Sequence, residues 1–356
     1  MRACFALAAK GAGTVSPNPL VGAVIVCDGK LLGKGYHQKF GGSHAEVNAI
    51  KNAHARHSNL RGSTLYVNLE PCAHYGNTPP CVKAIVHEGI AKVIAAMKDP
   101  NPLVAGKGFR YLRNAGVKVA ADVLKSEAEK LNERFVTYIT TGIPFVALKV
   151  AQTSDGFIAK KDGTSRWIST KASRTIAHKL RSEYDAVVVG RGTAEIDDPR
   201  LTVRNIKGRN PFRVLIDGKL RTPVEATMFN DKDRRRTIVF FGGGKTEKAR
   251  VLQAKGVQLI RMKSKNGVIA IPEILSVLAG RGIASLLVEG GQSVYRQFLK
   301  ARRVDKIYLF ISPKKFGEGL AAFGKSRQRF RITRESVKNT GGDSFIEGRV
   351  SFHKAQ

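Results

Sequence analysis

The segment EPCAHYGNTPPC at residues 70–81, together with HAE at residues 44–46, decides the fold of the first half of the chain. One histidine and two cysteines, His44, Cys72 and Cys81, suit Zn²⁺ and leave its fourth coordination position open. An open position is typical of a catalytic zinc ion. Glu46 is not needed as a ligand and could transfer protons beside the metal. The pattern therefore predicts a catalytic zinc site.

The local sequence also predicts how these side chains are presented. Cys72 and Cys81 each follow a proline and are expected to open a helix, whose N-terminus favours a thiolate. His44 and Glu46 are two residues apart and would diverge in a regular helix, so we expect His44 in the very first turn. Ser43-x-x-Glu46 also matches a capping box, which leaves the alternative that Glu46 only caps the helix. His54 and His57 are expected to be exposed at its end.

The flanking sequence predicts a layered α/β domain. Val21–Cys27 is an apolar run typical of a buried strand, and Asp28-Gly29 predicts a hairpin turn to a partner strand at Leu31–His37. Helical spacing follows at Ala45–Ala53. We place a domain boundary at Gly142-Ile143-Pro144, giving domains 1–143 and 144–356. The other strands expected in the first half are 64–69, 92–97 and 117–120, and the other helices are 81–88, 106–115 and 126–134, which together predict a mixed sheet with helices on its faces.

The second half has a second α/β pattern and a candidate anion site. The strand Ser285–Val288 is followed by Glu289-Gly290-Gly291-Gln292-Ser293, where a helix start would offer free N–H groups to a phosphate; the alternative is a simple tight turn. Arg181 and Arg204 could grip a phosphate, or could be surface charge. Gly242–Gly244 with Lys245 lacks Walker spacing and is expected to be a loop. The strands expected here are 145–150, 186–189, 213–216, 237–241, 257–260, 285–288 and 306–312, with helices at 171–181, 272–280 and 293–300.

The composition is that of a basic globular protein. The formal net charge is +33, of which +9 lies in residues 1–143 and +24 in residues 144–356. Such a field steers phosphorylated substrates and permits nucleic-acid binding. No aromatic stacking motif interleaves with the charges, so we favour a solvated surface and do not expect nucleic acid as a partner. Cys4 and Cys27 are expected to be inert core residues.

The apolar segments are short. The run from Ala3 to Ala9 is at the lower limit for a signal peptide, and no convincing cleavage site follows it. The longest uncharged runs, 11–27 and 135–148, fall short of a membrane span. We therefore expect a cytoplasmic protein that does not bind membranes.

The first half resembles the deaminase domain of the riboflavin-biosynthesis deaminase–reductase family. The resemblance rests on SPNPLVG at 16–22, GYH at 35–37, residues 44–46 and 70–81, and DPNP at 99–102. The eight-residue gap between the cysteines separates this family from cytidine and tRNA-adenosine deaminases. The resemblance implies a cytidine-deaminase-like three-layer fold, zinc on His44, Cys72 and Cys81, and Glu46 as the acid/base. It also implies a pyrimidine and ribose-phosphate pocket lined by Asn18, His37, His74 and Asn101. Asn77 stands where the family usually has a lysine or arginine.

The second half resembles the reductase domain of the same family, through Ser165–Ile168, Asp197–Arg204 and Glu289–Ser293. The resemblance extends to about residue 315 and implies a dihydrofolate-reductase-like α/β fold that uses NADPH. Lys149 lies where a basic residue near the reacting sugar carbon is expected, and Ser154 replaces a usually apolar residue. The implied NADPH contacts are Ala151, Trp167, Thr193, Asp197, Gly218, Gly291, Gln292, Ser293, Val294, Tyr295, Arg296 and Gln297. The implied substrate contacts are Ser165, Arg181, Leu201, Arg204 and Glu289.

The expected function follows from this resemblance. It comprises zinc-dependent hydrolytic deamination of 2,5-diamino-6-ribosylamino-4(3H)-pyrimidinone 5′-phosphate, then NADPH-dependent reduction of the ribosyl group to ribityl, in a homo-oligomer. The alternatives are a zinc deaminase of nucleic-acid bases, a nucleic-acid-binding protein built on a decayed enzyme, and a chain in which only one domain works.

Overall fold

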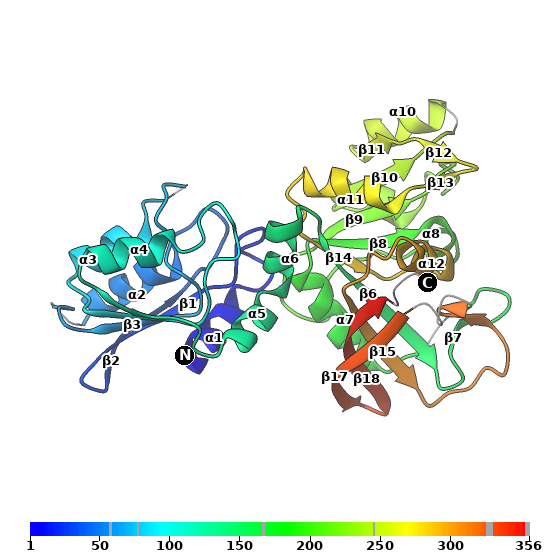
Figure 1. Cartoon of the computed structure of the whole chain (residues 1–356). Helices are drawn as coiled ribbons and strands as arrows, with labels where there is room; N and C mark the ends of the chain where they lie inside the picture. The colour runs from blue at the N-terminus through cyan, green and yellow to red at the C-terminus, as the bar shows by residue number, and fades with distance from the viewer. Residues whose placement is uncertain (57–58, 77, 166–167, 245, 325–329, 353–356) are drawn as a thin grey trace. The chain divides into compact units, whose positions relative to one another are not determined.

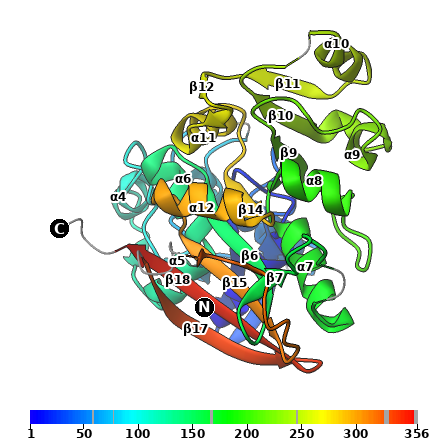
Figure 2. The ribbon, with the colours of Figure 1, turned by 90° about the vertical axis from the view of Figure 1, so that its right-hand side faces the viewer.

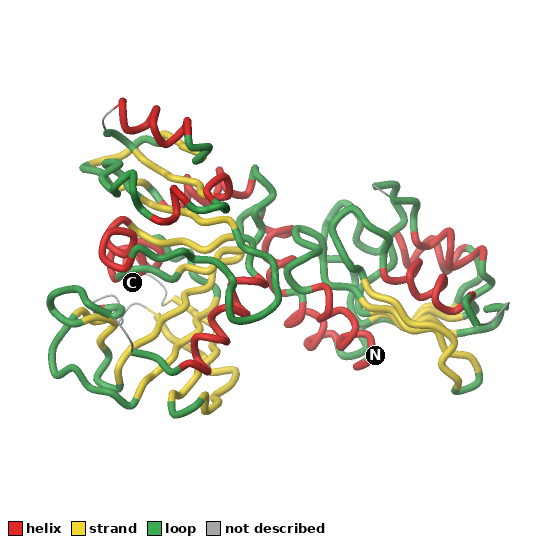
Figure 3. The backbone as a smooth tube through the Cα atoms, turned by 180° about the vertical axis from the view of Figure 1, so that it is seen from behind, coloured by secondary structure: helices red, strands yellow, loops and turns green. Residues whose placement is uncertain are grey.

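The chain folds into two compact units, Met1–Ile143 and Pro144–Gln356 (Figure 1). The structure is a computed structural model, and it describes residues 1–56, 59–76, 78–165, 168–244, 246–324 and 330–352. No helix among these residues is long and apolar enough to cross a membrane. Each unit is built on its own sheet, seen as the two sets of yellow strands in Figure 3.

Unit 1 is a three-layer α/β domain around a five-stranded mixed sheet. The strand order is β2-β1-β3-β4-β5, with antiparallel pairs around β1 and parallel pairs from β3 to β5. The strands are β1 (Gly22–Cys27), β2 (Lys30–Tyr36), β3 (Thr64–Val67), β4 (Lys92–Ala95) and β5 (Lys118–Ala120). The helices are α1 (Arg2–Ala8), α2 (Ala45–His54), α3 (Cys81–His87), α4 (Lys107–Asn114), α5 (Lys125–Leu131) and α6 (Glu133–Thr141).

Glycines set how closely the helices approach the sheet of unit 1. A Cβ on Gly35 would lie 2.3 Å from the backbone nitrogen of Ala49, so α2 can rest directly on β2. A Cβ on Gly22 would lie 2.2 Å from the carbonyl oxygen of Cys4, so α1 packs equally closely on β1. These glycines reduce the strand propensity of the sequence, but the close packing of the layers depends on them.

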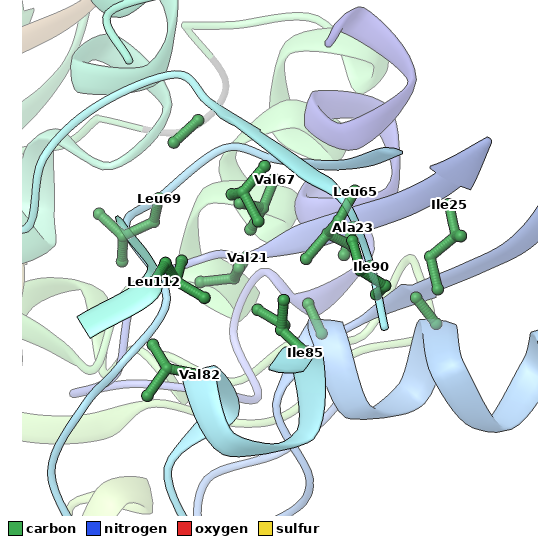
Figure 4. Close-up of a cluster of buried hydrophobic side chains, with 14 of the residues drawn as sticks. Val21, Ala23, Ile25, Leu65, Val67, Leu69, Val82, Ile85, Ile90 and Leu112 are labelled. Carbon is green, nitrogen blue, oxygen red and sulfur yellow. The ribbon is translucent and has the colours of Figure 1, made fainter. Parts of the chain in front are cut away.

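The core of unit 1 lies between the sheet and two helices, α2, whose N-cap is His44, and α3, which begins at Cys81. Val82 and Ile85 of α3 pack toward Leu65 and Val67 of β3, and Ile25 of β1 completes this side of the sheet (Figure 4). All five side chains are buried. Burying one such side chain stabilises the fold by about 1.5–3 kcal/mol, so the start of α3 is firmly anchored.

Unit 2 is built on a nine-stranded sheet in the order β11-β10-β9-β8-β14-β6-β15-β18-β17. The pairs from β11 to β15 are parallel, and the pairs of β18 with β15 and β17 are antiparallel. The strands are β6 (Phe145–Thr153), β8 (Ala186–Gly190), β9 (Phe212–Ile216), β10 (Thr237–Phe241), β11 (Gln258–Arg261), β14 (Ser285–Val288), β15 (Lys306–Ser312), β17 (Phe330–Thr340) and β18 (Asp343–Phe352).

Helices connect the parallel strands, and two small sheets complete unit 2. The helices are α7 (Lys171–Glu183), α8 (Arg191–Asp197), α9 (Thr227–Asn230), α10 (Thr246–Ala254), α11 (Ile271–Ala279) and α12 (Gln292–Lys300). The small sheets pair β12 (Ser264–Lys265) with β13 (Val268–Ile269), and β7 (Phe157–Ala159) with β16 (Leu320–Ala321).

The structure contains several elements that the sequence analysis does not predict. The apolar run near the N-terminus is helix α1, and residues 330–352 form the long hairpin β17–β18 at one edge of the sheet (Figure 2). Helices α6, α8 and α10 and strand β7 are also not predicted. Cys4 is buried as expected, but Cys27 is only half-buried because it ends an outer strand pair.

Candidate active sites

His44, Cys72 and Cys81 converge at one point in unit 1. Nδ1 of His44 lies 3.4 Å from Sγ of Cys72 and 3.3 Å from Sγ of Cys81, and all three ligand atoms lie within 4.8 Å of one another. A tetrahedral zinc ion with ordinary bond lengths requires a sulfur–nitrogen separation of about 3.6 Å. The donor set and its spacing therefore fit zinc.

The backbone presents each ligand in a different way. His44 is the N-cap of α2 and has extended backbone angles (φ −71°, ψ 165°), so it lies at the first turn as expected. Cys81 is the first residue of α3. The expectation that Cys72 also opens a helix is wrong, because it lies in the irregular segment after β3 that leads to Pro79-Pro80, where prolines exclude a helical conformation.

The two sulfur atoms differ in their protonation. The hydrogen bond from the Cys81 thiol lowers the pKa of Cys72 to about 4, and the backbone N–H of Cys81 also donates to Cys72 Sγ at 3.3 Å. The same hydrogen bond, together with burial, raises the pKa of Cys81. Cys72 is therefore a thiolate at neutral pH, which is the form that binds a metal.

Glu46 is buried beside this cluster. Its side chain is 4% exposed, and burial raises its pKa to about 7. The capping alternative is wrong, because the N-cap of α2 is His44 rather than Ser43 and no side-chain capping bond is present. A buried carboxyl group whose pKa lies near neutrality can both accept and donate a proton.

A cavity of about 350 Å³ opens beside the cluster and Glu46. The structure places all four of the expected substrate contacts, Asn18, His37, His74 and Asn101, on its wall. Nδ1 of His37 lies 3.1 Å from the carbonyl oxygen of Ser43, and burial lowers the pKa of His37. Neutral His37 therefore donates from Nδ1 and accepts at Nε2, where the amide of Asn18 lies at 3.2 Å.

Of the two further histidines considered in the sequence analysis, His54 and His57, the structure describes only His54. His54 is exposed and pairs with Glu88 at 2.8 Å, so it is not a ligand. His57 and Asn77 lie outside the described residues. The cavity wall also includes Phe135 and Ile139 of α6, which the sequence analysis does not identify because it does not predict that helix.

Glu70 is a buried carboxylate that holds the loop containing residues 99–109. Its oxygens accept four backbone N–H bonds, from residues 99, 106, 108 and 109, at 2.9–3.2 Å. A Cβ on Gly108 would lie 2.0 Å from the carbonyl oxygen of Pro71, so this loop packs directly against the cysteine segment. Glu70 thus connects the metal ligands to the loop that carries Asn101.

The second site is a cleft of about 1180 Å³ in unit 2. The reductase resemblance implies a set of cofactor and substrate contacts. Nearly all of those that the structure describes lie on the wall of this cleft. Arg296 is the exception: it is exposed on α12 and does not line the cleft, because helical rotation turns it away from neighbouring Tyr295 and Gln297. Trp167 lies outside the described residues. The implied residues on the wall are Lys149, Ala151, Ser165, Arg181, Thr193, Asp197, Leu201, Arg204, Gly218, Glu289, Gly291, Gln292, Ser293, Val294, Tyr295 and Gln297.

A buried ion network lies in this cleft. Arg181 contacts Glu289 through two bonds, Nε to Oε1 at 2.6 Å and Nη2 to Oε2 at 2.8 Å, and Nζ of Lys149 lies 3.9 Å from Oε2. Burial opposes the charge of Glu289, but Arg181 lowers its pKa to about 2. Burial lowers the pKa of Lys149. The sequence analysis offers Arg181 as a phosphate ligand. In the structure its guanidinium group is instead bonded to the buried carboxylate of Glu289.

The loop 198–204, between α8 and β9, has an unusual backbone. Asp198 and Leu201 have positive φ angles of 37° and 54°, although neither is glycine. The side chain of Asp198 accepts the N–H of Thr227 at 2.8 Å, and Nη1 of Arg204 contacts Thr202 Oγ1 at 2.9 Å. Strained residues on a cleft wall are a mark of a functional loop.

Ser154 is accommodated although the family usually has an apolar residue there. Its hydroxyl lies 3.1 Å from the carbonyl oxygen of Lys314, and its N–H donates to the same oxygen at 2.9 Å. His178, Lys219 and Arg221 also line the cleft, and the sequence analysis does not single them out. Each is an isolated residue with no motif around it.

These two sites define a class of protein: a zinc-dependent deaminase domain joined to a nucleotide-dependent reductase domain. Residues 1–97 match the model of the cytidine and deoxycytidylate deaminase zinc-binding region, and residues 144–346 match that of the RibD C-terminal domain. The riboflavin biosynthesis protein RibD of Aquifex aeolicus is 43% identical over 97% of this chain and 96% of its own length. That of Escherichia coli is 35% identical over 89% and 88%. The chain belongs to the RibD family.

Solved structures agree over the whole chain. The deaminase/reductase of Thermotoga maritima is 39% identical with a TM-score of 0.86, and Acinetobacter baumannii RibD is 34% identical with a TM-score of 0.87. Both alignments cover 98% of this chain and 97% of the other. The expected fold class is confirmed, with a cytidine-deaminase-like domain followed by a dihydrofolate-reductase-like domain. The protein is a bifunctional deaminase and reductase of riboflavin biosynthesis that uses zinc and NADPH, and the nucleic-acid alternative is not favoured.

Proposed function

We propose that the protein deaminates 2,5-diamino-6-ribosylamino-4(3H)-pyrimidinone 5′-phosphate and then reduces the ribosyl group of the product to ribityl. The Thermotoga maritima relative is described as a diaminohydroxyphosphoribosylaminopyrimidine deaminase and 5-amino-6-(5-phosphoribosylamino)uracil reductase. The observation that carries the proposal to this chain is the cluster of His44, Cys72 and Cys81, which lies beside a cavity whose wall includes Glu46.

In the first reaction, His44, Cys72 and Cys81 would hold the zinc ion. When bound there, zinc supplies Lewis acidity that makes water nucleophilic near neutral pH. The Glu46 carboxylate accepts a proton from the attacking water and delivers it to the departing amino group, so that ammonia leaves. The cavity wall orients the pyrimidine and its ribose phosphate through the amides of Asn18 and Asn101 and the imidazoles of His37 and His74, as the family resemblance implies.

In the second reaction, the cleft of unit 2 would hold NADPH, which supplies a hydride for C1′ of the sugar. The N–H groups at the start of α12, after Gly290-Gly291, face the cleft and can bind a phosphate of the cofactor. Lys149, at the edge of the ion network, would contact the sugar. Glu289 and Arg181 fix its position and complete the substrate side of the cleft.

The proposal is tested by a coupled assay on zinc-loaded protein. We expect ammonia release from the diamino substrate without NADPH, and NADPH oxidation only when NADPH is also present. Ammonia without any later oxidation would remove the second half of the proposal. No ammonia from zinc-replete protein would overturn the first half and direct attention to single-stranded nucleic acids.

The role of Glu46 is separated from that of the ligands by Glu46→Gln. We expect this variant to retain zinc and to reduce the deaminated intermediate normally, while deamination falls by about 10²–10⁴-fold. Loss of zinc from the variant would assign Glu46 a structural role instead.

We further propose that the enzyme is a homo-oligomer acting in the cytoplasm. Family membership supports the first point, and light scattering on the purified protein tests it. The four free cysteines support the second, because reduced thiols persist in the cytoplasm.

A further inference from the structure

The order of strands in unit 2 gives the cleft two distinct ends. Lys149 on β6 and the ion network mark the substrate end, and β14, β8 and β9 follow in order across the sheet. Neighbouring strands lie about 4.8 Å apart, so β9 lies about 14 Å from β6. A dinucleotide whose nicotinamide meets the substrate near β6 must therefore place its adenosine end near the carboxyl end of β9.

A rigid turn follows β9 at this far end of the cleft. The N–H of Leu220 donates to the carbonyl oxygen of Asp217 at 2.9 Å, and Leu220 has a φ of 49°. The carbonyl oxygen of Gly218 accepts N–H groups from Gly242 and Gly243 at 2.9 and 3.1 Å. A Cβ on Gly218 would lie 1.8 Å from the carbonyl oxygen of Gly267, so the tip of the β12–β13 hairpin presses against the turn.

Two unpaired cations stand on this turn. Lys219 and Arg221 are exposed, line the cleft, and form no ion pair or hydrogen bond with any residue that the structure describes. The aliphatic part of Lys219 lies along the hairpin tip, because a Cβ on Gly267 would come within 3.0 Å of its Cε. By contrast, Arg191 on the same wall is already paired with Glu195 at 2.6 Å.

The acid at the end of β9 is buried and bonded within the turn. In dinucleotide-binding sheets, an acidic side chain near such a strand end binds the ribose 2′-hydroxyl of NADH, whereas a cation accommodates the 2′-phosphate of NADPH. Asp217 directly follows β9, but its side chain is 1% exposed and Oδ2 accepts the N–H of Thr222 at 2.7 Å. Its carboxylate is thus used within the turn, and the two cations are left to meet the ligand.

We propose that Lys219 and Arg221 bind the 2′-phosphate of NADPH and set the preference of the reductase for NADPH over NADH. This inference rests on the proposed function, because it assumes that the nicotinamide end lies beside Lys149. It assigns the turn 217–222 a specificity role rather than a catalytic one.

The first test measures binding without any reaction. Adenosine 2′,5′-bisphosphate and adenosine 5′-monophosphate would be titrated calorimetrically into the full-length protein and into Lys219→Ala, Arg221→Ala and the double variant. We expect each single variant to weaken the bisphosphate about tenfold, the double variant to weaken it further, and the monophosphate to change less than twofold. Lys232→Ala, an exposed cation away from the cleft, is the matched control and should change neither.

The second test separates this inference from the proposed function. With the deaminated intermediate as substrate, the variants should raise the KM for NADPH about tenfold and leave the KM for NADH and both kcat values within twofold. Equal losses with both cofactors, or an unchanged KM for NADPH, would overturn the assignment of the 2′-phosphate. Failure of the wild-type protein to oxidise either cofactor would instead remove the reductase function on which the inference rests.

Discussion

Each unit contains a buried glutamate beside its site, and the two carboxylates are compensated in opposite ways. Glu70 in unit 1 accepts four backbone N–H groups. Glu289 in unit 2 is held by the guanidinium of Arg181, with the ammonium of Lys149 nearby. The first arrangement neutralises the carboxylate with backbone dipoles, and no basic side chain that the structure describes forms an ion pair with it. The second places full charges in the cleft, so its structure and its chemistry depend on the same side chains.

This difference predicts how mutations should affect activity and stability in each unit. In unit 1 the ligands carry the chemistry and Glu70 only frames it, so activity and stability can be separated by mutation. Under the proposed function the ion network of unit 2 serves both purposes, so activity and stability should be lost together. The following predictions test this contrast, in order of decreasing effect.

The largest effect is expected from Cys72→Ser. A hydroxyl does not replace a thiolate as a zinc ligand, so the variant should lose zinc, and deamination should fall by more than about 10³-fold. Reduction of the deaminated intermediate should be unchanged, because its residues belong to unit 2. Metal analysis and ammonia release check this, with Cys27→Ser as the control. A Cys72→Ser protein that keeps zinc and activity would contradict the ligand assignment.

Glu289→Gln should damage unit 2 in both respects. Removing one partner of a buried ion pair costs about 3–5 kcal/mol, because Arg181 is left buried without its counter-charge. We expect reduction to fall about 10²-fold or more and α7 to exchange amide hydrogens faster, while zinc content and deamination remain. Glu195→Gln, which breaks the exposed pair with Arg191, should cost less than about 1 kcal/mol. If the two variants behaved alike, the network would have no special structural role.

The sequence predicts those parts of the molecule whose cause is local. Zinc chemistry restricts its ligands to a few residue types, so His44, Cys72 and Cys81 can be identified from residue type and spacing alone. Strands β1 and β14 can be predicted because they are continuous apolar runs. The network around Glu289 cannot, because its partners are up to 140 residues apart and meet only when β6, α7 and β14 assemble.

The missed elements lack a clear apolar pattern. In β17 the only buried residue is Phe330, so the alternation that marks a strand is absent. In α10 the only buried residue is Leu252, so no apolar stripe forms. These elements are defined by backbone pairing and by neighbours distant in sequence, which a search for periodic patterns does not detect.

Glu70→Gln tests the same comparison at the buried carboxylate of unit 1. The new amide would place an NH₂ group opposite two of the N–H donors, which costs about 2–4 kcal/mol. Because Glu70 touches no expected substrate contact directly, we expect the loop carrying Asn101 to loosen. The KM for deamination should rise severalfold while kcat and zinc content change little. Glu88→Gln, which affects only the exposed partner of His54, is the control. A loss of kcat equal to that of Glu46→Gln would show that Glu70 acts in the chemistry.

The smallest effect concerns pH and again separates the two units. Burial, with the nearby charges of Arg181 and Arg204, lowers the pKa of His178 to about 4, whereas an unfolded chain binds that proton near 6.5. Between these values the unfolded state holds the extra proton, so the stability of unit 2 should fall as pH falls from 6.5 to 4, by up to about 3 kcal/mol. His178→Gln should remove this slope, and His54→Gln, on the surface of unit 1, should not. Denaturant unfolding followed by Trp167, the only tryptophan of the chain, reports on unit 2. If the stability of His178→Gln and of the wild type depended equally on pH, His178 would be protonated in the folded protein. The cleft would then hold one more positive charge than the ion network around Glu289 implies.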